Sequence, residues 1–257
     1  MVKAELTLRA NSLNMDTKVT VLLPEDRKET MDIRGKKYPV LYILHGYKED
    51  CSAWLNLSNI FLLCRDLDLI VVMPSANNSC YNNSKYGQNY YDWISEELPT
   101  KLKNYFPISD KREDTFIMGE SMGGYGTLRI ALSKPDKYGK AVCLSGANMA
   151  TRESIHKDME PFLGTKEEML GSDANIENLI RKIKDNNLDC PELRVYCGTE
   201  DFIFNDCKKI TEYMESVFPD KVKHEFWPGE HNFFFWNEAN PKALDFFGFK
   251  VKGNSVI

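Results

Sequence analysis

Short apolar runs that alternate with longer amphipathic segments are the feature that most limits the folds open to this chain. Several of these runs are apolar at nearly every position, which is typical of a strand buried on both faces. Strands that alternate with helices predict an α/β fold, with a mostly parallel central sheet flanked by helices on both faces. The predicted strands cover Thr17–Leu23, Tyr38–Leu44, Leu69–Met73, Asp114–Met118, Lys140–Ser145 and Leu193–Cys197.

The segments between these runs predict the helices. Pro107, Pro135 and Pro219 closely follow three of them, and proline commonly follows the end of a helix. Residues 24–37 are charged and rich in turn formers, whereas Lys221–Trp227 alternates in polarity as an edge strand does. The predicted helices cover Ser58–Arg65, Asp92–Phe106, Gly123–Ser133, Glu177–Asn186, Asp206–Phe218 and Pro241–Gly248.

The length of 257 residues permits one or two domains, at roughly 150 residues per domain. We expect a single domain over residues 1–257, because no internal repeat or low-complexity linker divides the chain. Residues 147–191, after the sixth core strand, are mostly polar. They predict a small cap-like insertion whose short helices lie over the carboxyl edge of the sheet.

Composition argues against several kinds of partner. The chain has 33 Lys and Arg against 38 Asp and Glu, a formal net charge of −5, without a basic block. Binding a polyanion needs a clustered basic face, so we expect no nucleic-acid partner and a neutral or small substrate. No run approaches the roughly 18 uninterrupted apolar residues of a membrane span. Composition does not distinguish a monomer from a homo-oligomer.

The cysteines and the N-terminus bear on the cellular compartment. The seven cysteines are an odd number and include no C-x-x-C pair, so we expect reduced thiols and no zinc site. The first residues have no apolar segment of the kind found in signal peptides. Together these observations favour a cytoplasmic protein.

The strongest motif is G-x-S-x-G at residues 119–123, which follows an apolar strand and precedes a helix. In that context the motif predicts a sharp strand–turn–helix that lifts the Ser121 hydroxyl above the sheet edge. Gly119 and Gly123 remove side chains that would clash at the turn. A chance match in a glycine-containing loop is the alternative. We expect Glu120, beside the serine, to be solvated or part of a pocket wall and not catalytic.

A serine hydroxyl needs a base to act as a nucleophile, and the chain has four histidines. His231 lies in a loop after the predicted edge strand and before an apolar helix, which favours it as the base. His224 lies within that strand, where a structural role is favoured, and His156 lies in the polar insertion, where we expect it to be solvated. His45 directly follows the strand Tyr38–Leu44.

The acid that orients the base should follow a strand between the serine and the histidine. Asp201 fits, because it comes after the strand Leu193–Cys197 and a glycine turn. Glu200 and Asp206 are the alternatives. The order Ser121, Asp201, His231 differs from the orders of the two other well-known serine-hydrolase classes.

Two backbone N–H groups should stabilise the oxyanion of an acyl-transfer reaction. Met122, directly after the serine, supplies one, and we assign the other to Tyr47 in the loop after Tyr38–Leu44. Gly46 lets the backbone approach the substrate, and the His45 ring then fixes the loop. The alternative is an ordinary glycine between strand and loop.

Aromatic residues gather in or near the loops at the expected carboxyl edge of the sheet. They could hold an acyl chain or a phenolic acid by apolar contact. The insertion lacks the long apolar face of an interfacial lipase lid, which favours small, soluble esters. The residues expected to bind substrate are Gly46, Trp54, Tyr86, Phe202 and Phe233.

With these residues placed, the chain resembles the esterase D-like family of α/β-hydrolases. Within it, the chain looks most like bacterial tributyrin esterases, which act on short acyl chains. The resemblance covers nearly the whole chain. The matching stretches are Tyr38–Gly46, Trp54, Ile70–Pro74, Tyr86–Gly87, Tyr90–Tyr91, Glu96–Pro99, Gly119–Gly126, Cys197–Phe202, Gly229–His231 and Trp236.

The resemblance implies an α/β-hydrolase fold and hydrolysis of carboxylic esters by Ser121, Asp201 and His231, with neither a metal nor an organic cofactor. Feruloyl esterases, acetylxylan esterases and S-formylglutathione hydrolases are similar relatives, so their substrates, and acyl transfer, are alternatives on the same three residues. The S-formylglutathione hydrolases tend to have histidine where this chain has Glu120, which weakens the thioester alternative. A non-catalytic binding scaffold is disfavoured, because binding needs none of the three residues.

Overall fold

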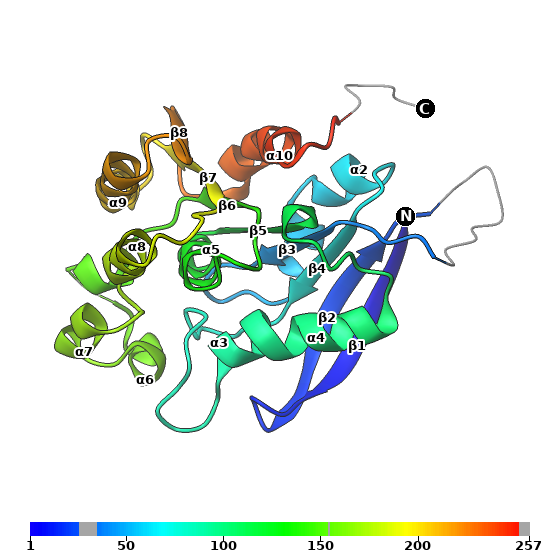
Figure 1. The fold of residues 1–257 in the computed structure, drawn as a ribbon, viewed down its shortest axis with the longest axis horizontal. Coiled ribbons are helices and arrows are strands. Elements are labelled where there is room, and N and C mark those ends of the chain that lie inside the picture. The colour runs from blue at the N-terminus through cyan, green and yellow to red at the C-terminus, as the bar shows by residue number, and fades with distance from the viewer. Residues whose placement is uncertain (26–34, 154, 252–257) are drawn as a thin grey trace.

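The structure, a computed structural model, describes residues 1–25, 35–153 and 155–251. One eight-stranded sheet runs through the molecule in the order β1-β2-β4-β3-β5-β6-β7-β8 (Figure 1). The pairs β1–β2 and β2–β4 are antiparallel, and the other neighbouring pairs are parallel. The strands are β1 Val2–Ala10, β2 Met15–Leu23, β3 Val40–Leu44, β4 Ile70–Pro74, β5 Thr115–Glu120, β6 Lys140–Leu144, β7 Glu192–Gly198 and β8 Val222–Trp227.

Helices cover both faces of this sheet, as the alternation of elements predicts. Side chains of β3 alternate between two apolar clusters, with Val40 and Tyr42 in one and Leu41 and Ile43 in the other. The first cluster includes residues of α4, α5, α8 and α9, and the second includes residues of α1, α2 and α10. The helices are α1 Ala53–Leu57, α2 Ile60–Cys64, α3 Tyr90–Asp92, the π-helical turn η1 Trp93–Glu97, α4 Leu98–Tyr105, the 3₁₀ turn η2 Arg112–Asp114, α5 Met122–Ser133, α8 Ile176–Asp185, α9 Phe204–Val217 and α10 Phe233–Phe247.

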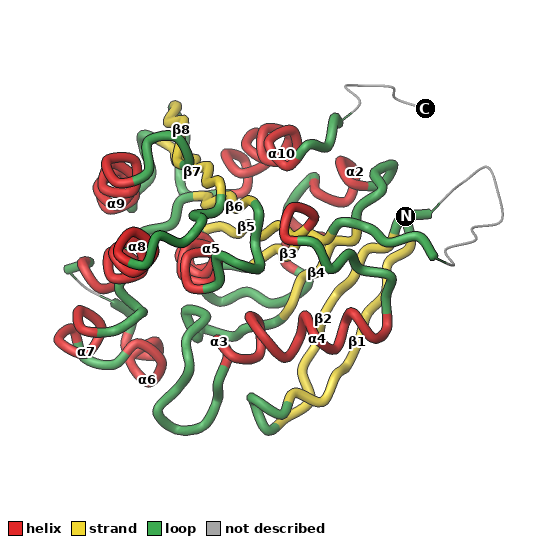
Figure 2. The backbone as a smooth tube through the Cα atoms, in the orientation of Figure 1, coloured by secondary structure: helices red, strands yellow, loops and turns green. Residues whose placement is uncertain are grey.

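The insertion between β6 and β7 consists of short helices and loops followed by α8 (Figure 2). The sequence is mostly polar there, yet Met149, Met159, Leu163 and Met169 are buried. These four side chains join the same apolar cluster as α5 and α8, which fixes the short elements to the body of the protein. The short elements are η3 Met149–Thr151, η4 Lys157–Met159, α6 Glu160–Leu163 and α7 Lys166–Gly171.

The sequence analysis missed one strand and misplaced the start of one helix. Strand β1 was not predicted, although Ala4, Leu6 and Leu8 alternate with polar residues as in a half-buried strand. Helix α10 begins at 233 and not at Pro241, because the Asn232 side chain accepts hydrogen bonds from the amides of 234 and 235 and caps the helix there. The proline lies inside this helix. Of the turn-rich segment 24–37, residues 26–34 lie outside the described residues.

Lys221–Trp227 was predicted as an edge strand, and β8 is the last strand of the sheet. The seven cysteines are all free and buried. Among the described residues, no helix combines the length and the apolar character needed to cross a membrane.

Candidate active site

The segment around Ser121 has the sharp strand–turn–helix geometry that its sequence predicts. Ser121 joins β5 to α5 with φ 55° and ψ −117°, a backbone conformation that is costly for a residue with a side chain. Close packing at the turn requires glycine on both sides. A Cβ atom on Gly119 would lie 2.6 Å from the carbonyl oxygen of Gly123, and one on Gly123 would clash with the carbonyl oxygen of Leu44.

Three side chains form a continuous series of hydrogen bonds at the carboxyl ends of the strands. The Nε2 atom of His231 lies 2.8 Å from Ser121 Oγ. Its Nδ1 atom lies 2.9 and 2.8 Å from the two carboxylate oxygens of Asp201. Since a carboxylate only accepts, Nδ1 carries the proton and Nε2 is left to accept the serine proton. Asp201 follows β7 and His231 follows β8, so parallel neighbouring strands bring them together.

The environment of Asp201 keeps its carboxylate charged. Burial opposes ionisation, but the hydrogen bond and charge interaction with His231 outweigh it and hold the pKa of Asp201 below its usual value. The amide of Ile203 donates to Oδ1 at 2.9 Å, which also favours the charged form. The two alternative acids lie elsewhere: Glu200 is exposed, and Asp206 pairs with Arg152.

The loop after β3 lies against the start of α5. The amide of Gly46 donates to the Glu49 carboxylate at 3.0 Å, so it is already occupied. The Tyr47 amide has no acceptor among the described residues. Met122 is the first residue of α5, a position where the N–H has no partner within the helix. Both amides that the sequence suggested as oxyanion donors thus have no acceptor among the described residues.

His45 fixes the base of this loop. The Ala76 amide donates to His45 Nε2 at 2.9 Å, so the proton of the neutral ring is on Nδ1, which donates to the Gly46 carbonyl at 2.8 Å. Burial is the main cause that lowers the pKa of His45 and favours this neutral form.

The insertion contacts the same loop through the side chain of Tyr47. The Tyr47 hydroxyl donates to the Asp158 carboxylate at 2.9 Å. Asn78 donates to the same carboxylate at 2.8 Å. The exposed His156 ring stacks on the Tyr47 ring, with centroids 4.4 Å apart, where we had expected it to be merely solvated. The insertion is therefore held against one wall of the site.

A cavity of about 420 Å³ opens at Ser121 and His231. Its wall includes Gly46, Phe202 and Phe233, three of the five residues that we expected to contact a substrate. The Phe202 side chain is 73 % exposed, with its ring 4.4 Å from that of His231, so it lies at the mouth of the cavity.

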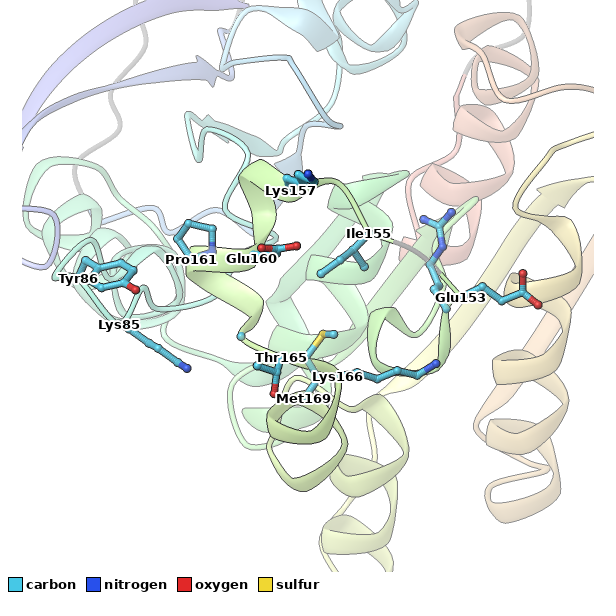
Figure 3. A pocket seen from close by; sticks show the side chains of 12 residues that line it. Lys85, Tyr86, Glu153, Ile155, Lys157, Glu160, Pro161, Thr165, Lys166 and Met169 are labelled. Atoms are coloured by element: carbon cyan, nitrogen blue, oxygen red, sulfur yellow. The ribbon is translucent and has the colours of Figure 1, made fainter.

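The other two expected substrate contacts need correction. Trp54 is 1 % exposed and does not line the cavity, because its side chain packs in the core. Its indole N–H donates to the Leu44 carbonyl, and its ring meets the Phe233 ring edge to face. Tyr86 is 82 % exposed and borders a different cavity, of about 530 Å³, beside the insertion (Figure 3). None of Ser121, Asp201 and His231 lines that second cavity.

Several residues of the cavity wall were not predicted. The insertion contributes Met149, Arg152, His156 and Met159. Nothing in the sequence indicates which side chains of a polar insertion turn inward. Trp236 also lines the wall, and its ring meets that of His231 edge to face at 5.1 Å. It could have been found, since it lies in the first turn of the apolar helix that follows the histidine.

Comparison with known proteins identifies the family of this chain. Residues 10–244 match the protein-family model described as "Putative esterase". The chain belongs to this esterase family. An acetyl esterase from Caldicellulosiruptor saccharolyticus is 28% identical over 260 residues, covering 95% of this chain and 97% of the relative.

Solved structures from Staphylococcus aureus resemble this esterase as well. The substrate-bound serine hydrolase FphF is 31% identical, with a TM-score of 0.87 over 96% of this chain and 98% of its own. The S-formylglutathione hydrolase FrmB, an apoenzyme structure, is also 31% identical, with a TM-score of 0.84 over 96% of this chain and 99% of its own. The fold is that of the α/β-hydrolases, and this esterase is a serine hydrolase of carboxylic esters.

Proposed function

We propose that this esterase hydrolyses esters of short acyl chains through a covalent acyl-enzyme on Ser121. The observation that carries the proposal is the hydrogen-bond series from Asp201 through His231 to Ser121, which ends at a cavity open to a substrate. A site that only bound a ligand would need neither the strained backbone of Ser121 nor the oriented ring of His231.

In the first step, Ser121 Oγ attacks the ester carbonyl while His231 Nε2 takes the hydroxyl proton. Asp201 keeps the histidine in the required tautomer and stabilises the imidazolium that forms. His231 then gives the proton to the leaving alcohol. In the second step, His231 removes a proton from water, which attacks the acyl-enzyme and releases the acid.

The amides of Met122 and Tyr47 are our candidates for the oxyanion hole. Neither has an acceptor among the described residues; Tyr47 lies in the loop after β3, and Met122 begins α5, which packs against the end of β3 at Gly123 and Leu44. Loss of one such donor typically lowers kcat by ~10²–10³. The amide of Gly46 is a poorer candidate because Glu49 already accepts from it.

The cavity favours a small acyl group. Met149, Met159, Phe202, Ile203 and Phe233 supply an apolar wall, and the volume of about 420 Å³ is at the lower end of the range for ligand pockets. The name of the acetyl esterase relative agrees with a short acyl chain.

Thioester hydrolysis is the second candidate. It is favoured by the 31% identity to FrmB, which is named an S-formylglutathione hydrolase. The same serine, histidine and oxyanion donors would act on a thioester, so the choice depends on how the cavity holds the leaving group.

A substrate panel tests the proposal. Wild type and Ser121→Ala are assayed on p-nitrophenyl acetate, butyrate and decanoate, on methyl ferulate and on S-formylglutathione. We expect the highest kcat/KM on acetate or butyrate, and loss of that activity in Ser121→Ala. A clear maximum on ferulate would refute the short-chain preference, and a maximum on S-formylglutathione would favour the second candidate. Equal activity of both proteins would refute the role of Ser121.

A further inference from the structure

Glu120 is the last residue of β5 and directly precedes Ser121. We had expected it to be solvated or part of the pocket wall. It does border the cavity, but it is only 1 % exposed, so it is not solvated. A buried carboxyl group beside the site of a developing negative charge is unfavourable in its charged form unless a partner compensates the charge.

The carboxyl group of Glu120 lies directly against the loop after β3. A Cβ atom placed on Gly46 would lie 2.5 Å from both Glu120 carboxyl oxygens. The Glu49 carboxylate accepts the Gly46 amide at 3.0 Å, whereas the buried Oε1 atom of Glu120 has no hydrogen-bond partner among the described residues. The carboxyl groups of Glu49 and Glu120 therefore both lie against Gly46, the residue before Tyr47.

A carboxyl group can donate to a neighbouring carboxylate only when it carries a proton. No Lys or Arg of the described residues forms an ion pair with either group. Burial, then the charge of Glu49, raise the pKa of Glu120 well above its usual value, so this buried carboxyl group keeps its proton.

The other titratable groups of these loops that lie near Glu120 supply no positive charge that would stabilise its ionised form. His45 is buried and neutral, and Tyr81, whose hydroxyl donates to the His45 carbonyl, has its pKa raised by burial. Asp50 has its pKa lowered by hydrogen bonds from Ser52, so it is a further negative charge. Ionised Glu120 would thus add negative charge to a region that already holds it.

We propose that protonated Glu120 is a positioning residue for ester hydrolysis. By donating to Glu49 it fixes the loop from Gly46 to Glu49, so that the Tyr47 amide faces the oxyanion. By staying neutral it keeps a second negative charge away from that oxyanion. The inference rests on the proposed function, because it concerns the same serine and the same oxyanion donors.

Two substitutions separate the effects of the hydrogen bond and of the charge. Glu120→Gln keeps a neutral donor of the same shape, and we expect its kcat to stay within about threefold of wild type at neutral pH. Glu120→Leu keeps similar bulk without the donor. We expect its kcat to fall by about 10²-fold with little change in KM, as for misplacement of a catalytic group. Each kcat is expressed per site titrated with a serine-directed organophosphonate, so that unfolded protein does not count.

The pH profile provides a readout that a merely structural role would not change. In wild type, kcat falls on the alkaline side as Glu120 loses its proton, because activity needs the protonated form. In Glu120→Gln this alkaline fall is absent. Glu49→Gln, which removes the neighbouring charge but can still accept from Gly46 and Glu120, moves the fall to lower pH, because Glu120 then ionises more easily.

The outcomes are distinct from those of the proposed function. Hydrolysis by wild type that is abolished in Ser121→Ala supports the proposed function whatever the Glu120 variants do. Glu120→Leu with wild-type kcat, Glu120→Gln as impaired as Glu120→Leu, or the same alkaline fall in wild type and Glu120→Gln would each overturn the positioning role. If Glu120→Leu does not fold, the pH profiles of wild type, Glu120→Gln and Glu49→Gln decide.

Discussion

The Nε2 atom of His231 lies 2.8 Å from Ser121 Oγ, although 110 positions separate the two residues in sequence. The distance is that of a hydrogen bond between a hydroxyl donor and an imidazole acceptor. The parallel order β5-β6-β7-β8 produces it, because the loops after these strands meet at one edge of the sheet.

Asp201→Asn should lower kcat by about 10⁴-fold with little change in KM, because an amide can donate to Nδ1 and so favour the wrong tautomer of His231. Steady-state kinetics on p-nitrophenyl butyrate measure the effect. Glu200→Gln, at the exposed neighbouring position, is the matched control and should stay near wild type. Equal losses in the two variants would contradict the assignment of the acid.

Gly46→Ala should lower kcat by about 10- to 100-fold, since a Cβ there would lie 2.5 Å from the Glu120 carboxyl oxygens and push the loop that carries Tyr47. Gly171→Ala is the control, because a Cβ at Gly171 meets nothing within 4 Å. Both variants are compared with wild type by kcat and by thermal unfolding. Unchanged kcat in Gly46→Ala would show that the loop does not position a reacting group.

Phe202→Ala should raise KM for the butyrate ester by about fivefold and for the acetate ester by less, because the lost apolar contact is worth about 1 kcal/mol for the longer chain. The control is Phe234→Ala, since Phe234 is 85 % exposed and does not line the cavity. The ratio of the two KM values is the measurement. An equal change for both esters would place the acyl chain elsewhere.

Stability should fall as pH drops below about 6.5, the usual pKa of histidine, because His45 is held neutral by burial. In this window the unfolded chain binds a proton that the folded protein does not. The free energy of unfolding therefore decreases by about 1.4 kcal/mol per pH unit until the lowered pKa of folded His45 is reached.

Urea unfolding of wild type and His45→Gln between pH 7.5 and about 5 measures this term. We expect a shallower slope in the variant, because glutamine does not titrate. Identical slopes in the two proteins would show that His45 does not contribute to the acid loss of stability.

Much of this site could be predicted from the sequence, because its chemistry depends on residues at strand ends. Ser121 is marked by a motif between a strand and a helix, and Asp201 and His231 each follow a strand in the expected order. The structure brings these three together. Backbone connectivity alone is enough to place residues of this kind.

The wall of the cavity could not be predicted in the same way. Trp54 and Tyr86 lie in suitable segments, but one side chain turns into the core and the other into solvent. Met149 and Met159 come from an insertion whose sequence is polar on average, and only the three-dimensional packing directs them inward. Glu120 lines the cavity, as one of its two expected roles required, but it is buried and not solvated because its carboxyl group lies against Gly46.

Trapping the acyl-enzyme tests the central claim most directly. Wild type and Ser121→Ala are mixed with p-nitrophenyl butyrate, quenched in acid within the first turnover, digested and analysed by mass spectrometry. We predict one butyryl group per wild-type chain, attached to Ser121, and none in the variant. A butyryl group on another residue, or turnover without any acylated Ser121, would contradict the account.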